Sequence, residues 1–449
     1  MSAIVRIGKK IKRLIKASDI PGANYMSLTR RIERVLTDQR ICAMTFDDGP
    51  CALPPQPWKN ESDSLTGVIL DILKEFGATA TFDVIGDTSG NYPDDIGVEG
   101  SPSWGGIKYD HYPLYEMDDK GGAKSQKGLI DRIIREGHEI SNHSYRHILF
   151  GKKNLIYNKR IHYNNIGEVL DDLYELDKLM EDRHGYKMTL ARPPHYVDKI
   201  SNGLTSYDAY DILRYQYMAA SFDGAGWLPL PGGYEDEVRA MWMPLEEKLK
   251  NNPDALRGQI IFQKDGYNMS SRSPVADGLR KQLEILKKYN YKVVSVSELL
   301  KVSKFRDISP KNPYYKAAAA LVDAGKCVAY RDNTIRPSKI ITKGELAMLL
   351  APHRVIIDRA IKMKEGKGET REFADIKVKH PYSSAAKWAV EKGFMNIEKG
   401  RFYPNKEVTD AEFDIVVSKL GNRLSKFEGK IKRGDAINTI YELTIKAKE

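Results

Sequence analysis

The stretch Ile41-Cys-Ala-Met-Thr-Phe-Asp47-Asp48-Gly49-Pro50 decides the fold of the first two thirds of this chain. Its first six residues are apolar and partly β-branched, which predicts a buried strand over 41–46, and two carboxylates stand where that strand ends. A second short strand is predicted over Gly137-His-Glu-Ile-Ser-Asn142, and it leads into His143-Ser-Tyr-Arg-His147. Parallel α/β folds place their ligands just past the carboxyl ends of strands. We therefore expect the two carboxylates and two imidazoles together at one edge of a parallel sheet.

These four side chains predict a divalent-metal site with a spare base. Two histidines at i and i+4 are expected on one face of a helical turn, so both can bind one ion, and one aspartate oxygen completes a set of three protein ligands. The second aspartate is then free to accept a proton. Alone, Asp-Asp-Gly is more often a polar turn and His-x3-His a chance match. Their shared position after strands favours the metal site over those two interpretations.

Short apolar runs alternate with longer helical patterns from residue 41 to about residue 300. A repeated strand-then-helix order implies a parallel sheet. Seven strands favour a distorted (β/α)7 barrel, of the α/β class, over an open sheet. The predicted strands are 41–46, 78–85, 137–142, 188–192, 217–222, 258–263 and 291–296, and the predicted helices include 64–76, 126–136, 166–184 and 274–289.

Residues 88–127 interrupt this alternation with a long segment that is rich in aromatic residues, glycine and proline. A loop of this length without regular structure is unusual in a compact domain and is often a lid or a binding loop. Trp104 and Tyr109 within it could stack on sugar rings. A loop held down by its own aromatic side chains is an equally good interpretation.

Beyond residue 304 the sequence repeats itself with a period near 70 residues. Phe305-Arg-Asp307-Ile308 recurs as Phe373-Ala-Asp375-Ile376, an offset of 375 − 307 = 68. Thr342-Lys-Gly-Glu345 recurs as Thr409-Asp-Ala-Glu412, an offset of 412 − 345 = 67, and a partial third copy follows at Lys432-Arg433-Gly434-Asp435. These matched signals predict a small, mainly α-helical repeat domain. The predicted domains are a basic extension over 1–40, the barrel over 41–303 and the repeats over 304–449.

Composition limits the classes of partner. The net charge of +10 favours anionic partners in a non-specific way, but the chain has no interleaved basic and aromatic motif, so we expect no nucleic-acid partner. No run of 18 or more apolar residues occurs, which predicts no transmembrane helix. The basic stretch 4–16 lacks the apolar core of a secretory signal; it could form an amphipathic helix on an anionic surface or a solvated helix. Three cysteines give no disulfide framework.

Residues 41–300 resemble the NodB-like polysaccharide deacetylases, carbohydrate esterase family 4. The resemblance rests on Thr45-Phe-Asp47-Asp48-Gly49-Pro50, His143-Ser-Tyr-Arg-His147 and Arg192-Pro193-Pro194. It implies that Asp47 is the catalytic base, that Arg192 steadies this base, and that the substrate is an acetylated polysaccharide. The implied metal ligands are Asp48, His143 and His147.

The chemistry of deacetylation agrees with that assignment. A Lewis-acid metal polarises the acetyl carbonyl and lowers the pKa of a bound water, while Asp47, held ionised by the cation and by Arg192, accepts the proton of that water. The family places an oxyanion donor just after the first motif; Pro50 has no N–H, so Cys51 is the candidate. We expect zinc, with cobalt, nickel or iron as alternatives. Further residues expected to line the substrate site are Pro194 and Trp227.

The acid half of the family's machinery is altered in this chain. The family's fourth motif carries an aspartate just before a tryptophan, whereas this chain has Gly226 before Trp227. The fifth motif ends in a histidine that protonates the leaving group, and Lys264 stands at that position. General acid catalysis contributes about 10² to 10⁴ in rate, so the change predicts reduced turnover or an easier leaving group. Lys264 could replace the acid if burial favoured its neutral form, but a solvated or salt-bridged side chain is an equally good interpretation. His195 is the other candidate, although for this residue a non-catalytic role is the favoured interpretation.

The repeats resemble S-layer homology domains, which anchor proteins to anionic polymers of the cell wall. In that family a basic residue follows the threonine of the Thr-x-x-Glu motif and contacts the polymer. Lys343 fits this pattern, Asp410 does not, and Arg433 fits it in the partial copy. A purely structural helical cap is the alternative interpretation.

The leading prediction is a metal-dependent hydrolase that removes acetyl groups from a cell-wall or extracellular polysaccharide. Two other interpretations stay open: a glycan-binding pseudoenzyme that keeps the metal, and a surface scaffold whose repeats carry the function. The repeats predict a location at the cell surface or cell wall. A cytoplasmic location is the alternative, because no signal peptide is visible.

Overall fold

The computed structural model of the chain describes residues 20–56, 63–87, 120–152, 162–227, 229–267, 272–367, 371–421 and 429–448. The basic stretch 4–16 and the loop aromatics Trp104 and Tyr109 lie outside these described residues. Among the described helices, none combines the length and the apolar character needed to cross a membrane. The chain divides into two compact units, which we call the sheet unit (residues 33–201 and 217–303) and the helical unit (residues 1–32, 202–216 and 304–449).

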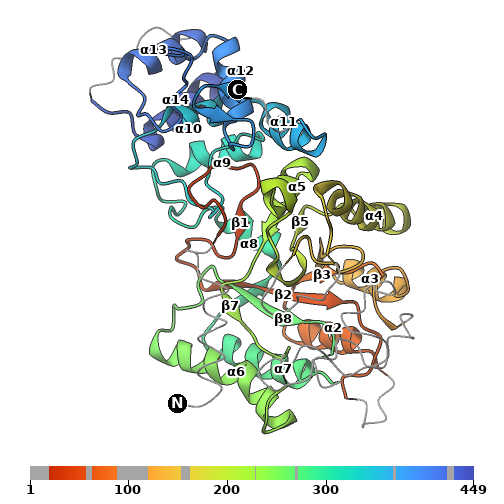
Figure 1. Cartoon of the computed structure of the whole chain (residues 1–449). Coiled ribbons are helices and arrows are strands. Elements are labelled where there is room, and N and C mark those ends of the chain that lie inside the picture. The colour runs from red at the N-terminus through yellow and green to blue at the C-terminus, as the bar shows by residue number, and fades with distance from the viewer. Residues whose placement is uncertain are drawn as a thin grey trace. The chain divides into compact units, whose positions relative to one another are not determined.

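A mainly parallel sheet forms the centre of the sheet unit (Figure 1). Its strands are β2 (Ile41–Gly49), β3 (Thr81–Val84), β4 (Glu139–Asn142), β5 (Leu190–Ala191), β6 (Gln216–Met218), β7 (Phe222–Asp223), β8 (Ile260–Lys264) and β9 (Lys292–Val294). Hydrogen-bonded neighbours follow the order β6-β5-β4-β3-β2-β8-β7, and β9 pairs with β2. β6 and β7 stand at opposite ends of this run of seven strands, yet only residues 219–221 separate them, so the chain passes directly from one end of the run to the other. The predicted distorted barrel is confirmed.

Strand β2 is the buried centre of this sheet. Its apolar residues are fully covered because parallel partners flank it on both edges and helices cover the faces. The register of the two parallel pairings sets Asp47 opposite Asp83 of β3 on one edge and opposite Lys264 of β8 on the other. Three charged residues from three strands therefore meet at the carboxyl end of the sheet.

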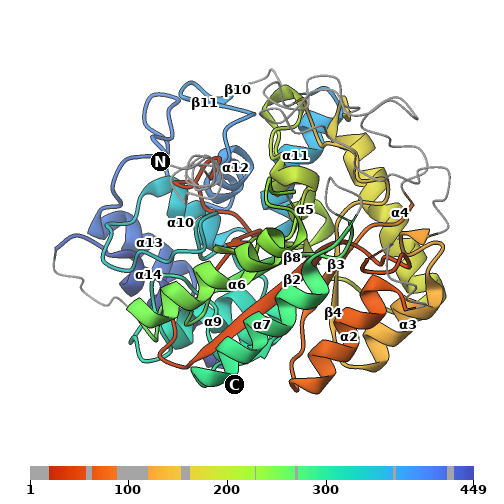
Figure 2. The same cartoon turned by 90° about the horizontal axis from the view of Figure 1, so that it is seen from below.

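The helices of the sheet unit begin and end where local signals predict. They are α2 (Leu65–Glu75), α3 (Lys127–Arg135), α4 (Ile166–His184), α6 (Tyr234–Asn251), α7 (Val275–Lys288) and α8 (Val296–Val302). The four predicted helices are confirmed to within one residue at each end; Asn165 caps α4, and Gly185 ends it in the left-handed conformation. Helix α6 was not predicted, because Pro244 interrupts its pattern. Figure 2 shows α6, α7, α2 and α3 in a row, and each packs on the next.

The helical unit is built from the sequence repeats. Its elements are α5 (Ser206–Leu213), α9 (Tyr315–Asp323), α10 (Lys343–Leu350), α11 (His353–Lys364), α12 (Ser383–Glu391), α13 (Asp410–Lys419), α14 (Arg433–Thr444) and the short strands β1 (Arg31–Ile32), β10 (Arg371–Phe373) and β11 (Ile376–Lys377). Thr342 and Thr409 form matching capping boxes at the starts of α10 and α13. Asp307 accepts two successive backbone N–H groups, and Asp375 does the same in the second copy. The repeat is thus structural as well as sequential.

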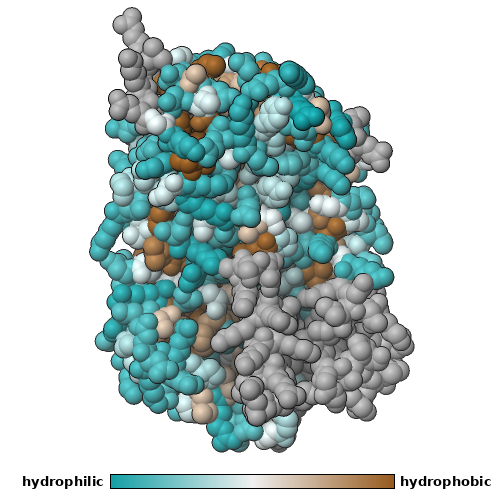
Figure 3. Space-filling model, turned by 60° about the vertical axis from the view of Figure 1, so that its left-hand side comes forward, coloured by the Kyte–Doolittle hydropathy of each residue, from teal (hydrophilic) through white to brown (hydrophobic). Residues whose placement is uncertain are grey.

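The described surface is mostly polar. Figure 3 shows one face of the molecule, on which apolar residues lie in small, separate areas among hydrophilic ones. Exposed large apolar side chains of the described residues are scattered, for example Tyr174 on α4 and Met243 on α6. Scattered residues of this kind are normal on a folded protein and mark no interface.

Candidate active site

Asp47 and Asp48 leave strand β2 on the same side, although neighbours in a strand normally point to opposite faces. Asp48 has a φ of 74°, and the register of β2 with β3 shifts between Asp47 and Gly49. As a result His143 Nε2 lies 3.2 Å from Asp48 Oδ1 and 3.8 Å from Asp47 Oδ2. One irregular residue at the strand end therefore delivers two carboxylates to one site.

The segment from His143 to His147 is a turn, and the predicted helical turn is wrong. Ser144 and His147 have φ values of 76° and 55°, which no right-handed helix contains. The buried Asp172 of α4 fixes the turn, because its carboxylate accepts the backbone N–H groups of Tyr145 at 2.9 Å and Arg146 at 3.0 Å. The side-chain hydroxyl of Ser144 accepts the N–H of His147 as well. The i and i+4 spacing still brings both imidazoles together, by a different backbone route.

The structure brings three donor atoms together in the way a divalent metal requires. Asp48 Oδ1 lies 3.2 Å from His143 Nε2 and 3.0 Å from His147 Nε2, and all three residues are nearly buried. Ligand atoms about 2 Å from one zinc ion in tetrahedral geometry are separated by roughly 3 to 3.5 Å, so these spacings fit. A second group of possible ligands, formed by Asp47, Asp83 and His143, shares the same histidine.

Asp83 is a site residue that the sequence reasoning missed. It is fully buried in the middle of β3, and its Oδ2 lies 3.0 Å from His143 Nδ1. The carbonyl oxygen of Arg192 lies 2.8 Å from the same nitrogen and has the better hydrogen-bond geometry of the two. A carbonyl only accepts, so Nδ1 donates and Nε2 turns its lone pair toward Asp48. Ser141 donates a short hydrogen bond to the other oxygen of Asp83. An aspartate inside an apolar predicted strand was the signal that could have revealed it.

The electrostatics of the site favour a cation. Burial alone would lower the pKa of His143, but the carboxylates of Asp83, Asp48 and Asp47 outweigh it and hold the pKa well above its usual value. The same field would favour a metal ion in place of the proton. Burial would raise the pKa of Asp48, but Lys264 and His147 hold it well below its usual value, so this ligand stays ionised. Burial lowers the pKa of His147, which favours the neutral form that metals bind.

Asp47 and Arg192 form a buried pair beside these ligands. Arg192 is fully buried and donates a short hydrogen bond to Asp47 Oδ1, a second at 3.1 Å to Thr45 Oγ1 and a third at 3.2 Å to the Met218 carbonyl. Its guanidinium is therefore fixed in place. Burial raises the pKa of Asp47 to about 6 even though Arg192 acts in the opposite direction. A carboxyl with that pKa can both accept and release a proton near neutral pH.

The predicted acid replacement, Lys264, contacts Asp48, one of the predicted metal ligands. Its Nζ donates to Asp48 Oδ2 at 2.6 Å, and only 8% of the residue is exposed. Gly226 has a φ of 86°, and a Cβ at this position would lie 3.1 Å from Val275 and 3.3 Å from Met241. The family's aspartate would therefore be strained and crowded there. The nearby Asp223 accepts the indole N–H of Trp227 at 3.3 Å.

The backbone N–H of Cys51, our expected oxyanion donor, already has an acceptor. It donates to Thr66 Oγ1 at 2.7 Å, and that hydroxyl lies 2.8 Å from both oxygens of Asp265. Burial raises the pKa of Asp265 to about 7. The described geometry therefore does not support Cys51 as a free donor, because the N–H that the sequence order suggested is used inside the turn.

Two further predicted residues lie close to the ligands. His195 has a φ of 53°, and its ring centroid lies 4.9 Å from that of His147. Pro194 is buried next to it, at the start of a short 3-10 helix that follows β5. Tyr196, in the same 3-10 helix, stacks on the Arg192 guanidinium at 5.6 Å. The third motif thus lines the site from one side.

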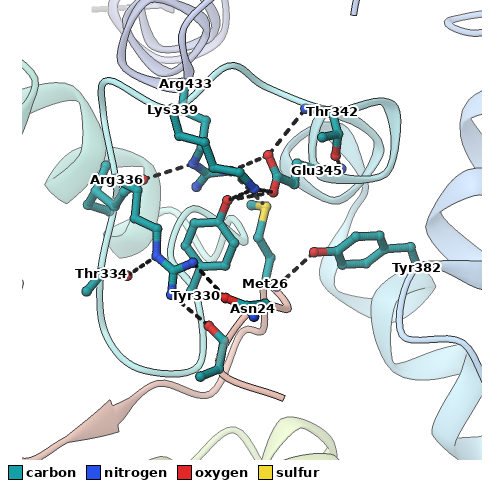
Figure 4. Close-up of polar contacts among 12 residues, drawn as sticks. Asn24, Met26, Tyr330, Thr334, Arg336, Lys339, Thr342, Glu345, Tyr382 and Arg433 are labelled. Carbon is teal, nitrogen blue, oxygen red and sulfur yellow. Dashed lines mark hydrogen bonds and ion pairs between the residues drawn. The ribbon is translucent and has the colours of Figure 1, made fainter. Parts of the chain in front are cut away.

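The predicted polymer-binding cations of the helical unit, Lys343 and Arg433, are buried. Figure 4 shows Arg433 beside Tyr330, Lys339 and Glu345. Arg433 donates to the carbonyls of Ile335 at 2.9 Å and Val328 at 2.7 Å, and it lies over the Tyr330 ring. Lys343 donates to the Asn396 carbonyl at 2.9 Å. Both cations therefore contact protein groups, and polymer binding through them stays a prediction.

Family models match two parts of the chain. Residues 34–198 match the polysaccharide deacetylase family, and residues 304–347 and 372–413 match the S-layer homology domain. The first match contains the two motifs that supply Asp47, Asp48, His143 and His147. The second contains both complete sequence repeats.

Curated relatives are peptidoglycan deacetylases. The chain is 26% identical over 287 residues to the peptidoglycan-N-acetylmuramic acid deacetylase PdaC of Bacillus subtilis, a match covering 64% of this chain and 44% of PdaC. It is 24% identical over 270 residues to a peptidoglycan-N-acetylglucosamine deacetylase of Bacillus cereus, covering 60% of this chain and 91% of that protein. The chain thus spans less than half the length of PdaC.

Solved structures of similar proteins align weakly. The structure of PdaC from Bacillus subtilis aligns at 23% identity and a TM-score of 0.37, covering 60% of this chain and 93% of that one. BA3943 of Bacillus anthracis, described as a CE4 family pseudoenzyme, aligns at 16% identity and a TM-score of 0.37, covering 60% and 67%. By its sequence matches, the chain carries a domain of the polysaccharide deacetylase family followed by S-layer homology domains.

Proposed function

We propose that the chain is a metal-dependent hydrolase that removes acetyl groups from a cell-wall polysaccharide. The observation that carries the proposal is the convergence of Asp48 and the two histidines on one point, with the Asp47–Arg192 pair beside it. The ligands are Asp48, His143 and His147; the base is Asp47. Peptidoglycan is the substrate we infer, since the matched relatives are peptidoglycan deacetylases.

The chain's own residues can carry both proton transfers. A bound divalent metal would supply a Lewis acid that polarises the acetyl carbonyl and activates a water. Asp47 accepts the proton of the attacking water as the new C–O bond forms, while Arg192 keeps the carboxylate in line. When the bond to the sugar nitrogen or oxygen breaks, the leaving atom needs that proton. We propose that Asp47, which lies beside the predicted ligands and is held by Arg192, returns it.

Lys264 and His195 are the alternative proton donors. Lys264 Nζ donates a hydrogen bond to Asp48. A proton on Nζ therefore lies near the reacting centre, but it is already hydrogen-bonded to the proposed ligand carboxylate. The ring of His195 lies beside the ring of His147, with the two ring centroids 4.9 Å apart. Replacing Lys264 by Met separates these roles: if Asp47 shuttles the proton, turnover falls mainly through weaker metal binding, which excess metal restores.

A catalytically impaired, glycan-binding protein is the second candidate. It is favoured by the positive φ and close contacts at Gly226, which disfavour an aspartate there, and by the resemblance that sets Lys264 at the position of the family's acid histidine. Such a protein would keep the metal and bind acetylated glycan without releasing acetate.

Acetate release from an N-acetylglucosamine oligosaccharide or purified peptidoglycan separates the two candidates. The purified chain should release acetate, and Asp47→Asn should lower the rate by about 10² to 10⁴ while metal content stays the same. Asp71→Asn, an exposed carboxylate on α2, is the matched control and should behave as wild type. Retained glycan binding with no acetate release by the wild type would favour the impaired protein instead. An unchanged rate in Asp47→Asn would refute the mechanism.

We also propose that the S-layer homology domains hold the chain on an anionic wall polymer. The support is the sequence match of both repeats together with the cluster of cations around Tyr330, formed by Arg336, Lys339 and Arg433. Co-sedimentation of the full chain with purified cell walls tests it. Lys339→Ala should reduce binding, whereas Lys367→Ala, an exposed lysine of the same unit, should not. Equal sedimentation of both variants would count against this surface.

A further inference from the structure

A cavity of about 490 Å³ lies within the helical unit. Four segments line it: residues 27–30, residues 211–216 at the end of α5, the loop that follows α9 and the loop that follows α10. None of the residues discussed above as metal ligands or polymer contacts is among the lining residues. Small-molecule sites commonly have volumes of about 300 to 1,000 Å³, so this cavity has room for a molecule the size of one sugar.

Arg30 is a buried cation in the wall of this cavity. Only 6% of it is exposed, and the described part of the chain offers it no carboxylate within ion-pair distance. Its Nε donates to the Gln216 side chain, and its Nη1 donates to the Lys304 carbonyl and to the Asn333 side chain, all neutral acceptors. Among the described residues no group accepts from Nη2. A buried guanidinium without an anion is costly, and burial lowers its pKa to about 10.

Holding three segments together explains only part of this arrangement. The hydrogen bonds of Nε and Nη1 do link residue 30 to Gln216, Lys304 and Asn333. Neutral hydrogen bonds could be made by an uncharged side chain, however, so they account neither for the charge nor for the unused Nη2. A guanidinium with one free donor edge is suited to a carboxylate or phosphate.

Other cations surround the same cavity. Arg214 ends helix α5 in the left-handed conformation, is exposed, and has no carboxylate partner among the described residues. Lys326 donates to the Leu350 carbonyl at 3.0 Å. His353 is favoured in its neutral form, because burial and Arg214 lower its pKa. The lining therefore carries three cations.

Asp211 is the single carboxylate of the lining, and the protein already satisfies it. Its oxygens accept the backbone N–H of Thr29 at 2.6 Å and the hydroxyl of Ser27 at 3.1 Å. It makes no ion pair with Arg30 or Arg214 within the described residues. The cavity thus keeps a net positive charge beside apolar walls such as Val322 and Pro352.

We propose that this cavity binds a small oxyanion, a carboxylate or phosphate carried on a sugar-sized body, with the anionic group at Arg30 and Arg214. The volume exceeds that of a bare phosphate, which is why the anion should carry a body that covers the apolar wall. This site is separate from the deacetylation site and does not depend on it.

Calorimetric titration of the full chain with glucose 6-phosphate, glucuronate and glucose tests the proposal. At least one of the two anions should bind and glucose should not, and which anion binds tells phosphate from carboxylate. Arg214→Ala should weaken that binding at least tenfold. Arg354→Ala is the matched control: it removes the same charge from an exposed residue next to His353 and should leave binding unchanged.

Two further variants keep the result unambiguous. His147→Ala, which removes a proposed metal ligand, should bind the anion as tightly as wild type, so that an anion held at the metal site is recognised. Arg30→Gln should abolish binding if its melting curve shows a folded protein. No binding of either anion, loss of binding in His147→Ala, or equal affinities of Arg214→Ala and Arg354→Ala would each overturn the proposal.

Discussion

The backbone of Asp48 shows how one residue shapes the site. Its φ of 74° costs a non-glycine residue on the order of 1–3 kcal/mol, and such a conformation persists only where the surroundings enforce it. Here Lys264 and the two histidines hold the side chain, and strand pairing holds the backbone on either side. The strained backbone conformation places two consecutive carboxylates in one site.

Asp83 is expected to be a positioning residue for His143. Removing its charge should weaken the hold on the imidazole, because the carboxylate lies 3.0 Å from Nδ1 and supports a ligand-ready Nε2. We predict that Asp83→Asn lowers metal affinity by about 10- to 100-fold. Titration of the metal-free protein with zinc measures this. Asp71→Asn, far more exposed, should bind zinc as the wild type does; equal affinities for Asp83→Asn and wild type would remove Asp83 from the site.

Gly226 is expected to be irreplaceable for two separable reasons. At Gly226 the backbone φ is 86°, and an added Cβ would lie close to Val275 and Met241. At Gly185 the φ is 60°, and an added Cβ would lie in open space. Gly226→Ala and Gly185→Ala should each lose about 1 kcal/mol from the backbone, and Gly226→Ala should lose roughly 1–3 kcal/mol more. Urea unfolding of both variants checks the difference. Equal losses would show that the pocket can accept a side chain and that the missing aspartate was not excluded by space.

At the scale of elements, helix α4 holds the turn that carries the two histidines. Asp172→Asn replaces one of the two acceptors for the N–H groups of Tyr145 and Arg146 by a donor. We predict a loss of about 1–3 kcal/mol in stability and weaker zinc binding, because a buried N–H loses its partner. The control is Asp171→Asn on the exposed face of the same helix. An unchanged zinc affinity of Asp172→Asn would mean that the turn keeps its conformation without the Asp172 carboxylate.

The sequence predicted the elements better than the contacts between them. Apolar runs and caps located β2, α4 and the repeats, since each of these signals is local. The expected convergence of Asp48, His143 and His147 followed from their positions after strand ends, and their role as metal ligands stays a prediction. Asp83 and the acceptor of the Cys51 N–H could not be found in this way, because they depend on register between strands and on a hydroxyl fifteen residues away. Pro244 hid helix α6, since a tertiary environment tolerates a residue that local rules forbid.

At the scale of the whole molecule, Asp211 should make the stability of the helical unit depend on pH. Burial, together with Asp208, raises its pKa to about 6 from an ordinary 3.8. The folded state therefore binds this proton more tightly than the unfolded state, so the free energy of unfolding falls as pH rises from about 4 to above 6. The shift of about two pH units corresponds to roughly 3 kcal/mol.

Asp211→Asn should remove that dependence. Urea unfolding at pH 4.5 and at pH 8 gives, at each pH, the difference in free energy of unfolding between the variant and wild type. This difference should be about 2–3 kcal/mol more in favour of the variant at pH 8 than at pH 4.5. Asp323→Asn, an exposed carboxylate of the same unit, is the control and should show no such trend. A constant difference between Asp211→Asn and wild type across this range would contradict the assignment.

The most direct test of the account is one titration with two readouts on the metal-stripped full chain. We predict that one equivalent of zinc binds and that acetate release from N-acetylated glycan rises in step with it. Asp47→Asn should bind the same equivalent without releasing acetate, and His147→Ala should lose both. Acetate release that is independent of metal, or undiminished in Asp47→Asn, would contradict the central claim.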